Sequence, residues 1–378
     1  MGRESVMKIG WLRRRTFVIL TFCIALVLTL TVSPWPATAG GRPSTINGPL
    51  LLIEQRGQRS QQVQIGAGQD EILSVEGGRV RRILGALTAT CCGLGGLASS
   101  PSGRYIAFTQ EYATQDKPPT EGLWIVTTQG TNYHRLLRPP HGQSGPLSIA
   151  PLAWSPDGYT LAYAVDFFTD TPVNPHDIPN AGIWLTRYDS IQPRLLVTQM
   201  QLDEAAPQLI ATCGPISFGP TITALSWAPD GRTLTASINC APVSRPGHIV
   251  QAIVAVDVPT RQIHPLVMGG HDATFSPTTG QLAYVVDGTT GTNLWVANER
   301  GQSRHVLVTT PTRIGSLAWS PDGRAIAYLT STADGRGTVL DIVDIATGHH
   351  QIVLSANRSG LPVGGYFTRV AWARAPVS

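Results

Sequence analysis

The chain has 378 residues, of which 42% are hydrophobic and 14% are charged, a composition typical of a globular protein. Its 39 glycines and 29 prolines favour many turns and short strands over long helices. The length allows one large domain or two of ordinary size.

The first 39 residues have the three parts of a secretory signal peptide. Three arginines (13–15) precede an apolar run over 16–32, and Ala37-Thr38-Ala39 follows as a small-residue cleavage site. We expect a signal peptide over 1–39, a short linker over 40–48 and a single domain over 49–378. The apolar run of about 17 residues also reaches the lower limit for crossing a bilayer, so an N-terminal membrane anchor is the alternative.

Removal of the predicted signal peptide changes the net charge of the chain. The formal net charge of the whole chain is +4, but residues 1–39 hold five of the 28 basic and one of the 24 acidic residues. The remainder therefore has 23 of each and a net charge of zero. Nucleic-acid binding loses its electrostatic basis, and we expect no nucleic-acid partner.

One phrase recurs along the chain. The letters LAWSPDG occupy 152–158 and return at 317–323, and related phrases begin at residues 97, 225 and 273. An alternating run follows each one, as in YTLAYAVD (159–166). In the turn, Pro presets φ, Asp suits the third position and Gly adopts the left-handed conformation after it. The phrase therefore predicts a β-hairpin.

Each repeat contains two more predicted strands. The third strands are expected at 122–128, 182–188, 248–258, 292–298 and 339–345. The fourth strands are expected at 134–137, 194–197, 262–267, 304–308 and 351–354. Four antiparallel strands per repeat, with repeats about 45–70 residues apart, indicate the blades of a β-propeller.

The two ends of the chain supply one further blade. An inner strand is predicted at 370–372 without outer strands after it, and outer strands are predicted at 49–55, 71–76 and 80–84 without an inner strand. We therefore expect an all-β fold: six blades in one ring, closed by a blade that the N- and C-terminal strands share. Closure also removes an exposed sheet edge.

These repeats resemble a known family. An apolar run, Trp or Phe, SPDG and then an alternating strand with Ala and Tyr is similar to the PD40, or WD40-like, repeat of the TolB C-terminal propeller. The likeness is most specific at 154–163 and 319–328, and weaker at Ser102-Gly103 and at 278–280. The N-terminal α/β domain of TolB has no counterpart here, so the resemblance covers the propeller alone.

Searches for catalytic motifs are negative. The sequence lacks G-x-S-x-G, H-E-x-x-H, a Walker loop and an EF-hand loop. Asp157, Asp230 and Asp322 of the SPDG turns are interpreted as turn caps. The blade tryptophans are interpreted as packing residues: Trp124, Trp154, Trp184, Trp227, Trp295, Trp319 and Trp372. We expect no cofactor and no metal.

Binding residues are expected in the loops opposite the SPDG turns, because these loops differ from one another. In the loop 167–180, Phe167 and Phe168 are candidate aromatic anchors, with Asp170 and His176 as polar contacts. The alternative is a proline-rich loop that covers the ring. His271 and Asp272 are candidates for a cation or an anionic ligand at the channel mouth, or for hydrogen bonding within the channel.

Four cysteines remain after removal of the signal, and an even count in an exported protein favours disulfides. Cys213 precedes the inner strand of the third repeat and Cys240 ends its second strand, which predicts a Cys213–Cys240 disulfide. Cys91-Cys92 form a vicinal disulfide or stay reduced. Buried free thiols are the alternative for all four.

The leading functional hypothesis is an exported, non-catalytic propeller that binds a protein, a peptide or an envelope component. We expect a monomer located outside the cytoplasm: periplasmic, on the cell surface or secreted. The alternatives are a propeller enzyme of hydrolase, lyase or lactonase type with a channel site, and the sensor domain of a receptor that keeps its N-terminal helix as a membrane anchor.

Overall fold

Twenty-four β-strands form six four-stranded antiparallel sheets in the computed structural model. The structure describes residues 47–56, 69–85, 93–110, 122–138, 147–167, 180–213, 222–241, 249–333, 335, 337–355 and 365–375. The predicted signal peptide and almost all of the linker lie outside these residues, so the predicted export signal stays a prediction.

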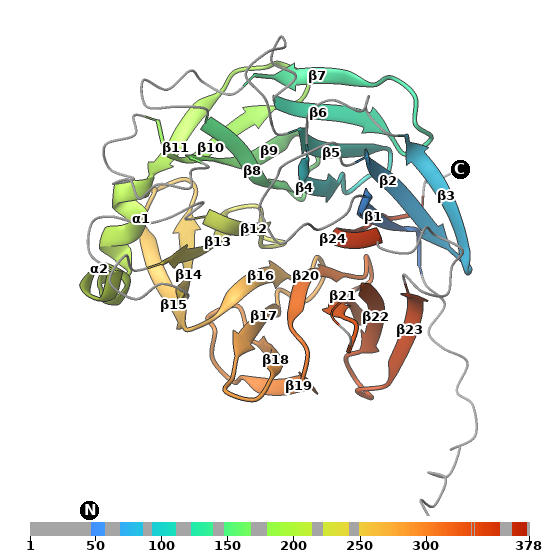
Figure 1. Cartoon of the computed structure of the whole chain (residues 1–378). Helices are drawn as coiled ribbons and strands as arrows, with labels where there is room; N and C mark the ends of the chain where they lie inside the picture. The colour runs from blue at the N-terminus through green and yellow to red at the C-terminus, as the bar shows by residue number, and fades with distance from the viewer. Residues whose placement is uncertain are drawn as a thin grey trace, which may run out of the picture. The chain divides into compact units, whose positions relative to one another are not determined.

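Each sheet is one blade of a ring (Figure 1). The inner strands are β4 (Leu94–Ser99), β8 (Leu147–Trp154), β12 (Ile222–Trp227), β16 (His271–Phe275), β20 (Ile314–Trp319) and β24 (Gly365–Trp372). The second strands are β5 (Tyr105–Gln110), β9 (Thr160–Phe167), β13 (Thr233–Cys240), β17 (Leu282–Asp287), β21 (Ala325–Ser331) and β1 (Leu50–Arg56). The third strands are β6 (Gly122–Thr127), β10 (Gly182–Arg187), β14 (Val250–Asp257), β18 (Thr292–Ala297), β22 (Thr338–Asp344) and β2 (Gln69–Glu76). The outer strands are β7 (His134–Leu137), β11 (Arg194–Thr198), β15 (Ile263–Met268), β19 (His305–Thr310), β23 (His350–Ser355) and β3 (Arg79–Leu84). We number blades 1 to 5 along the chain and call β24-β1-β2-β3 the closing blade.

The ring is closed. Each inner strand contacts the inner strand of the next blade, from β4 through β8, β12, β16, β20 and β24 back to β4. In the closing blade, the C-terminal β24 pairs antiparallel with the N-terminal β1, with Leu50 opposite Trp372. The predicted six-bladed propeller and its shared blade are therefore confirmed.

The hydrophobic core is divided among the blade interfaces. Six clusters of buried residues each combine side chains from two neighbouring blades. Trp154 of blade 2, for example, packs in one cluster with Ala107 and Leu123 of blade 1. All seven blade tryptophans belong to these clusters, which confirms that they are packing residues.

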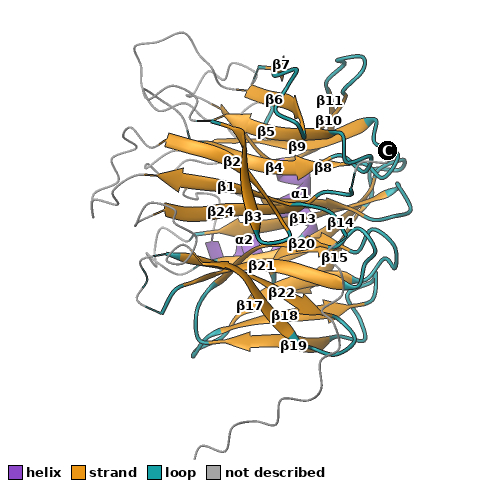
Figure 2. Ribbon diagram, turned by 90° about the vertical axis from the view of Figure 1, so that its right-hand side faces the viewer, coloured by secondary structure: helices purple, strands orange, loops and turns teal. Residues whose placement is uncertain are grey.

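The recurring turns have the predicted conformation. The glycines that end these turns have φ between 67° and 75° (Gly103, Gly158, Gly231, Gly280 and Gly323). This left-handed region is accessible to glycine at little cost. All five turns lie on one side of the ring, which we call the turn face. The opposite side, where the inner strands begin, we call the loop-rich face. Figure 2 views the ring edge-on, with the described turns gathered towards its right-hand side.

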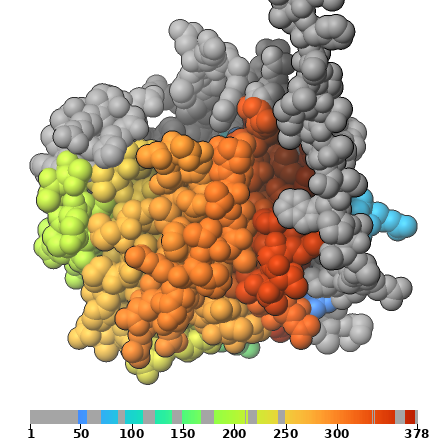
Figure 3. Space-filling model, turned by 90° about the horizontal axis from the view of Figure 1, so that it is seen from below, coloured from blue at the N-terminus to red at the C-terminus, as the bar shows by residue number. Residues whose placement is uncertain are grey.

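The connection 199–220, between blades 2 and 3, contains two short helices in its described part. They are α1 (Gln199–Ala205) and α2 (Pro207–Cys213), and they contact β14 and β15 of blade 3 (Figures 1 and 3). Thr198 caps α1 in a capping box with Gln201, and Leu202 and Leu209 are buried. The capping box of Thr198 and Gln201 is the sequence signal for this helical connection. Neither helix is long and apolar enough to cross a membrane, and these are the helices of the described residues.

The closing strand yields a first prediction. Deleting 370–378 removes the part of β24 that lies opposite Leu50, Leu51 and Leu52, all fully buried. Loss of Trp372 alone is expected to cost roughly 3–5 kcal/mol, the usual size for a buried aromatic residue. We therefore expect a large drop in the thermal unfolding midpoint, followed by circular dichroism. The control is deletion of 376–378 only, which leaves β24 intact. An unchanged midpoint in the long deletion would contradict closure by β24.

Candidate functional site

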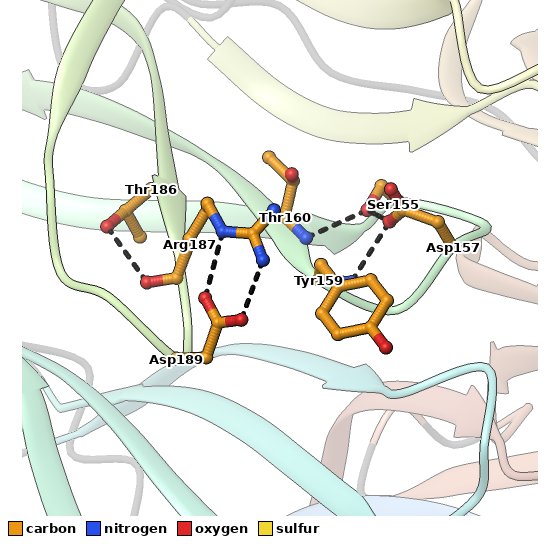
Figure 4. A network of polar contacts seen from close by, with 7 residues as sticks. All are labelled: Ser155, Asp157, Tyr159, Thr160, Thr186, Arg187 and Asp189. Atoms are coloured by element: carbon orange, nitrogen blue, oxygen red, sulfur yellow. Dashed lines mark hydrogen bonds and ion pairs between the residues drawn. The ribbon is translucent and has the colours of Figure 1, made fainter.

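The SPDG turns use their polar groups within the turn. In blade 2 (Figure 4) the Ser155 hydroxyl donates to the Asp157 carboxylate, and the backbone N–H of Tyr159 donates to Asp157 Oδ1 at 3.0 Å. In blade 3 the Asp230 carboxylate accepts from both backbone and hydroxyl of Thr233 at 2.8–2.9 Å. Partial burial acts to raise the pKa of Asp230, but these hydrogen bonds hold it below its usual value. The interpretation of these aspartates as turn caps is confirmed.

An aromatic group borders the same turn in blade 2. Arg187 forms a two-pronged contact with Asp189, at 2.9 and 2.6 Å, and its guanidinium lies 5.2 Å from the centroid of the Tyr159 ring (Figure 4). Tyr188 lies 5.5 Å from Trp154, also between ring centroids. Because the arginine is half exposed, this ion pair contributes little stability. Two of its five N–H donors are engaged by Asp189, and the ring of Tyr159 covers the guanidinium on one side.

The loop-rich half of the inner strands is irregular in every blade. Each inner strand shows a register shift against its second strand, and the shift always falls three or four residues before the last residue of the inner strand. Such bulges redirect side chains, and they are over-represented next to functional sites. The residue three positions before the strand end differs in each blade: Gly96, Pro151, Ala224, Asp272, Ser316 and Arg369. In β12 and β24 the residue at this position, Ala224 or Arg369, is still paired with the second strand, and Thr223 and Thr368 are the unpaired residues.

Two of these positions have unusual backbone geometry. Asp272 has φ 49° and Ser316 has φ 48°, in the left-handed region that non-glycine residues rarely adopt. Such conformations cost about 1–3 kcal/mol each and concentrate at functional sites. Ser316 uses its hydroxyl to accept the backbone N–H of Val370 at 3.0 Å, which links blade 5 to the closing blade.

His271 and Asp272 form a buried polar pair at the start of β16. Nδ1 of His271 lies 3.0 Å from Asp272 Oδ2, and Nε2 lies 3.4 Å from Asp287 Oδ2. The His271 side chain is 5% exposed, Asp272 is 19% exposed and Asp287 is 44% exposed. The histidine therefore lies between two carboxylates, one buried beside it and one at the surface. Sequence reasoning found the first carboxylate and missed Asp287, which ends β17.

The charges within this group reinforce one another. Burial acts to lower the pKa of His271, but the hydrogen bond to Asp272 and the charges of Asp272 and Asp287 raise it above its ordinary value. Burial acts to raise the pKa of the Asp272 carboxyl, but the hydrogen bond from His271 and the charges of His271, Arg369 and Arg313 lower it. The pair is therefore stabilised in its charged form.

The predicted binding residues of the loop 167–180 are not described by the structure. Phe168, Asp170 and His176 lie outside the described residues, and so does the side chain of Phe167 at the end of β9. Their roles stay predictions. Among the described residues, no group of three or more His, Cys, Asp or Glu side chains could hold a metal ion.

Arg313 and Arg369, which sequence reasoning missed, act electrostatically on Asp272. Arg369 also donates Nε to the carbonyl of Gly95 at 2.9 Å, which connects β24 to β4. The sequence does carry a signal for Arg369. When the repeats are aligned on the last residue of each inner strand, the residue three positions earlier differs from repeat to repeat, and Arg369 occupies this position in β24. Arg313 precedes β20 in a connection where no repeat position can be aligned.

The chain was compared with known proteins. No family model matches it. Over 73 residues, 19% of this chain, it is 34% identical to the Tol-Pal system protein TolB of a Polaromonas species, and the match spans only 17% of that protein.

Solved structures extend the likeness to most of the chain. TolB from Acinetobacter baumannii matches with a TM-score of 0.58 at 14% identity, over 88% of this chain and 68% of that one. A chain of a nidogen–laminin complex matches with a TM-score of 0.57 at 13% identity, over 88% of this chain and 100% of that one. At such identities the likeness shows the fold alone: a TolB-like six-bladed propeller.

The His271–Asp272 pair predicts a pH dependence of stability. We expect Asp272→Asn to destabilise the protein more at pH 5.5 than at pH 9, measured by urea unfolding. The raised pKa of His271 adds stability that is fully present below its ordinary value of 6.5 and is lost as pH rises through the folded value. The lowered pKa of Asp272 adds stability that is lost only as pH falls below the ordinary value of 3.8.

Asp287→Asn is the matched control for this prediction. Asp287 is more exposed and lies farther from His271, so this variant should lower the pKa of His271 less than Asp272→Asn does, as followed by NMR titration. Equal effects of the two variants would contradict the geometry.

The cysteine positions support the predicted disulfide without fixing its partner. Cys240 is buried and disulfide-bonded, while the side chain of Cys213, at the end of α2, lies outside the described residues. Because α2 contacts β13, which ends at Cys240, we expect non-reducing peptide mapping to link Cys213 with Cys240. A free thiol at Cys213 would contradict this pairing.

Proposed function

We propose that this chain is an exported, non-catalytic propeller that binds a protein partner through its loop-rich face. The observation that carries the proposal is the difference between the two faces. On the turn face the same turn recurs and its carboxylates are engaged in their own turns. Towards the loop-rich face, every inner strand is bulged, and the residue three positions before the strand end differs from blade to blade, as with Asp272, Ser316 and Arg369.

The similarity to TolB supports the proposal at the level of the fold. The relative from Polaromonas is described as a protein of the Tol-Pal system, and another structural match is part of a complex between two proteins. A propeller of this kind can bind another protein without catalytic residues. The predicted signal over 1–39 adds that binding takes place outside the cytoplasm, in the periplasm, at the cell surface or after secretion.

A propeller enzyme is the second candidate, and one observation favours it. His271 lies between two carboxylates and its pKa is raised, as expected of a general acid or base near neutral pH. Against it, one of the histidine nitrogens is already engaged by Asp272, and the strand backbone holds the pair in the ring wall.

Site-specific photo-crosslinking tests the binding proposal. Met268, at the loop-rich end of β15, is 42% exposed, and Tyr159 on the turn face is 47% exposed. A photoreactive amino acid should therefore be similarly exposed at the two positions. We expect a discrete protein adduct in the cell envelope from position 268 and none from position 159.

Two outcomes would contradict the proposal. An adduct from position 159 alone would place the partner on the turn face, and the absence of adducts from both positions would oppose protein binding. A stoichiometric metal ion in the purified protein would favour the propeller enzyme instead.

A further inference from the structure

Blade 1 differs from the other four repeats in the charge of its turn face. Each repeat has two connections there, the SPDG-type turn and the link between its third and outer strands, and the structure describes all of them. Blades 2 to 5 carry a carboxylate in or directly beside these connections: Asp157, Asp189, Asp230, Asp257, Glu299, Asp322 and Asp344. In blade 1, Ser102 replaces the turn aspartate and the link 128–133 reads TQGTNY, so neither connection carries an acidic residue.

Three arginines lie at the boundary between blade 1 and the closing blade, which we call the seam. Arg104 directly follows the turn glycine of blade 1, and its carbonyl accepts the backbone N–H of Thr128 at 3.0 Å. The Arg81 guanidinium reaches from β3 to the carbonyl of the same Thr128 at 2.9 Å. The carbonyl of Arg374 lies against Gly103, where a side chain would have no room. These contacts gather Arg81, Arg104 and Arg374 around one turn.

The seam arginines are exposed, and their charge is not neutralised locally. Among the residues that the structure describes, none of the three has a carboxylate within 4.0 Å. Glu76 and Arg79 lie opposite each other in the β2–β3 hairpin, so their charges offset each other. The seam therefore keeps a surplus of positive charge.

Arginines elsewhere on the turn face have acidic neighbours. Arg232 follows the turn glycine of blade 3, as Arg104 does in blade 1, but it lies 3.8 Å from Asp257. In blade 2, Arg187 is paired with Asp189 at 2.6 Å. The surplus charge thus distinguishes the seam from equivalent positions in other blades.

The chain enters the described structure on the same face, next to the seam. Asn47 donates its side-chain amide to Asp322 of the blade 5 turn at 2.9 Å, and the Trp372 indole donates to the carbonyl of Gly48 at 3.2 Å. The 14 residues of 33–46 join this point to the apolar run 16–32, and 14 extended residues span at most about 50 Å. A retained anchor would therefore hold the turn face near the bilayer.

We propose that the turn face docks on an anionic lipid surface at the seam, with Arg81, Arg104 and Arg374 against the headgroup phosphates. Guanidinium groups form charge-assisted hydrogen bonds with phosphate oxygens, and each basic residue near an anionic membrane strengthens binding. Tyr133, which ends the link 128–133, is 36% exposed, and an aromatic ring with a polar tip suits the headgroup layer. A lipid is favoured over an acidic protein because the chain leads from this face to its apolar run.

This inference goes beyond the proposed function, because it assigns a second surface with a different partner. The turn face and the loop-rich face lie on opposite sides of the ring. Docking at the seam would therefore direct the loop-rich face away from the membrane, where a protein partner can reach it.

Vesicle co-sedimentation of the mature protein, residues 40–378, tests the docking. Vesicles of phosphatidylcholine alone are compared with vesicles in which about one third of the lipid is phosphatidylglycerol, at low and at physiological salt. We expect sedimentation with the anionic vesicles only. This binding should weaken as the salt concentration rises, because salt screens exposed charges.

Variants assign the binding to the seam. Arg104→Gln and Arg374→Gln should each weaken binding to the anionic vesicles about fivefold, the effect of one basic residue near a charged membrane. Neither side chain makes a hydrogen bond with a described residue, so both variants should keep the unfolding midpoint of the wild type. The matched control is Arg232→Gln, which removes the same charge at the equivalent position of blade 3. Because Asp257 offsets Arg232, this control should change the affinity less than about twofold.

Several results would overturn the lipid docking: equal sedimentation with neutral vesicles, an equal loss in Arg232→Gln, and no sedimentation with either vesicle. A photoreactive amino acid at position 104 that yields a protein adduct and no lipid adduct would assign the seam to an acidic protein instead. The proposed function is judged separately by the adduct from position 268. If that adduct forms while the vesicles are not bound, the lipid docking is wrong and the binding function stands. If the vesicles are bound but no adduct forms, the reverse holds.

Discussion

The pairing of β1 with β24 is the contact on which the rest of the structure depends. A blade of this size cannot bury its faces alone, and each apolar cluster is built from two neighbouring blades. If the ring were open, both terminal blades would expose one apolar face and an unpaired strand edge. The chain meets this requirement by joining strands more than 300 residues apart, with Leu50 opposite Trp372 and the Trp372 indole donating to Gly48 O. The apolar clusters between blades are therefore buried completely only when the ring is closed.

Polar side chains hold the blades in register where hydrophobic contact cannot. In three inner strands, a side chain from the preceding blade accepts a backbone N–H at or near the start of the strand. Asp70 accepts from Leu94 at 2.7 Å, Asp166 accepts from Ile222 at 3.0 Å, and Ser237 accepts from Ala273 at 3.0 Å. Burial raises the pKa of Asp70 despite its hydrogen bond to Leu94. An unsatisfied buried N–H is costly, so these acceptors help to position the three inner strands against their neighbouring blades.

The turn face and the loop-rich face differ in how their polar side chains are hydrogen-bonded. On the turn face, each aspartate that the sequence repeats is engaged by its own turn, and such local satisfaction leaves little for a ligand. At the bulges, the backbone is irregular and the side chains differ from blade to blade. Charges of opposite sign meet at the bulge of β16, where His271 lies between Asp272 and Asp287. A ring built from repeats gains a specific surface only where its repeats diverge, and the bulges provide that divergence without disturbing the packing between blades.

The sequence by itself determined the six blades, the five turns with left-handed glycines and the shared closing blade, because these features depend on local backbone preferences and on a period-two pattern. It also placed His271 beside Asp272, since neighbours in sequence are neighbours in space. Helix α1 carried a readable signal in Thr198 and Gln201, which have the spacing of a capping box. Only the tertiary structure decided that Asp287 completes the histidine group and that the charges of Arg313 and Arg369 help to lower the pKa of the Asp272 carboxyl. Those residues come from three different blades, and no local pattern records which side chains a closed ring brings together.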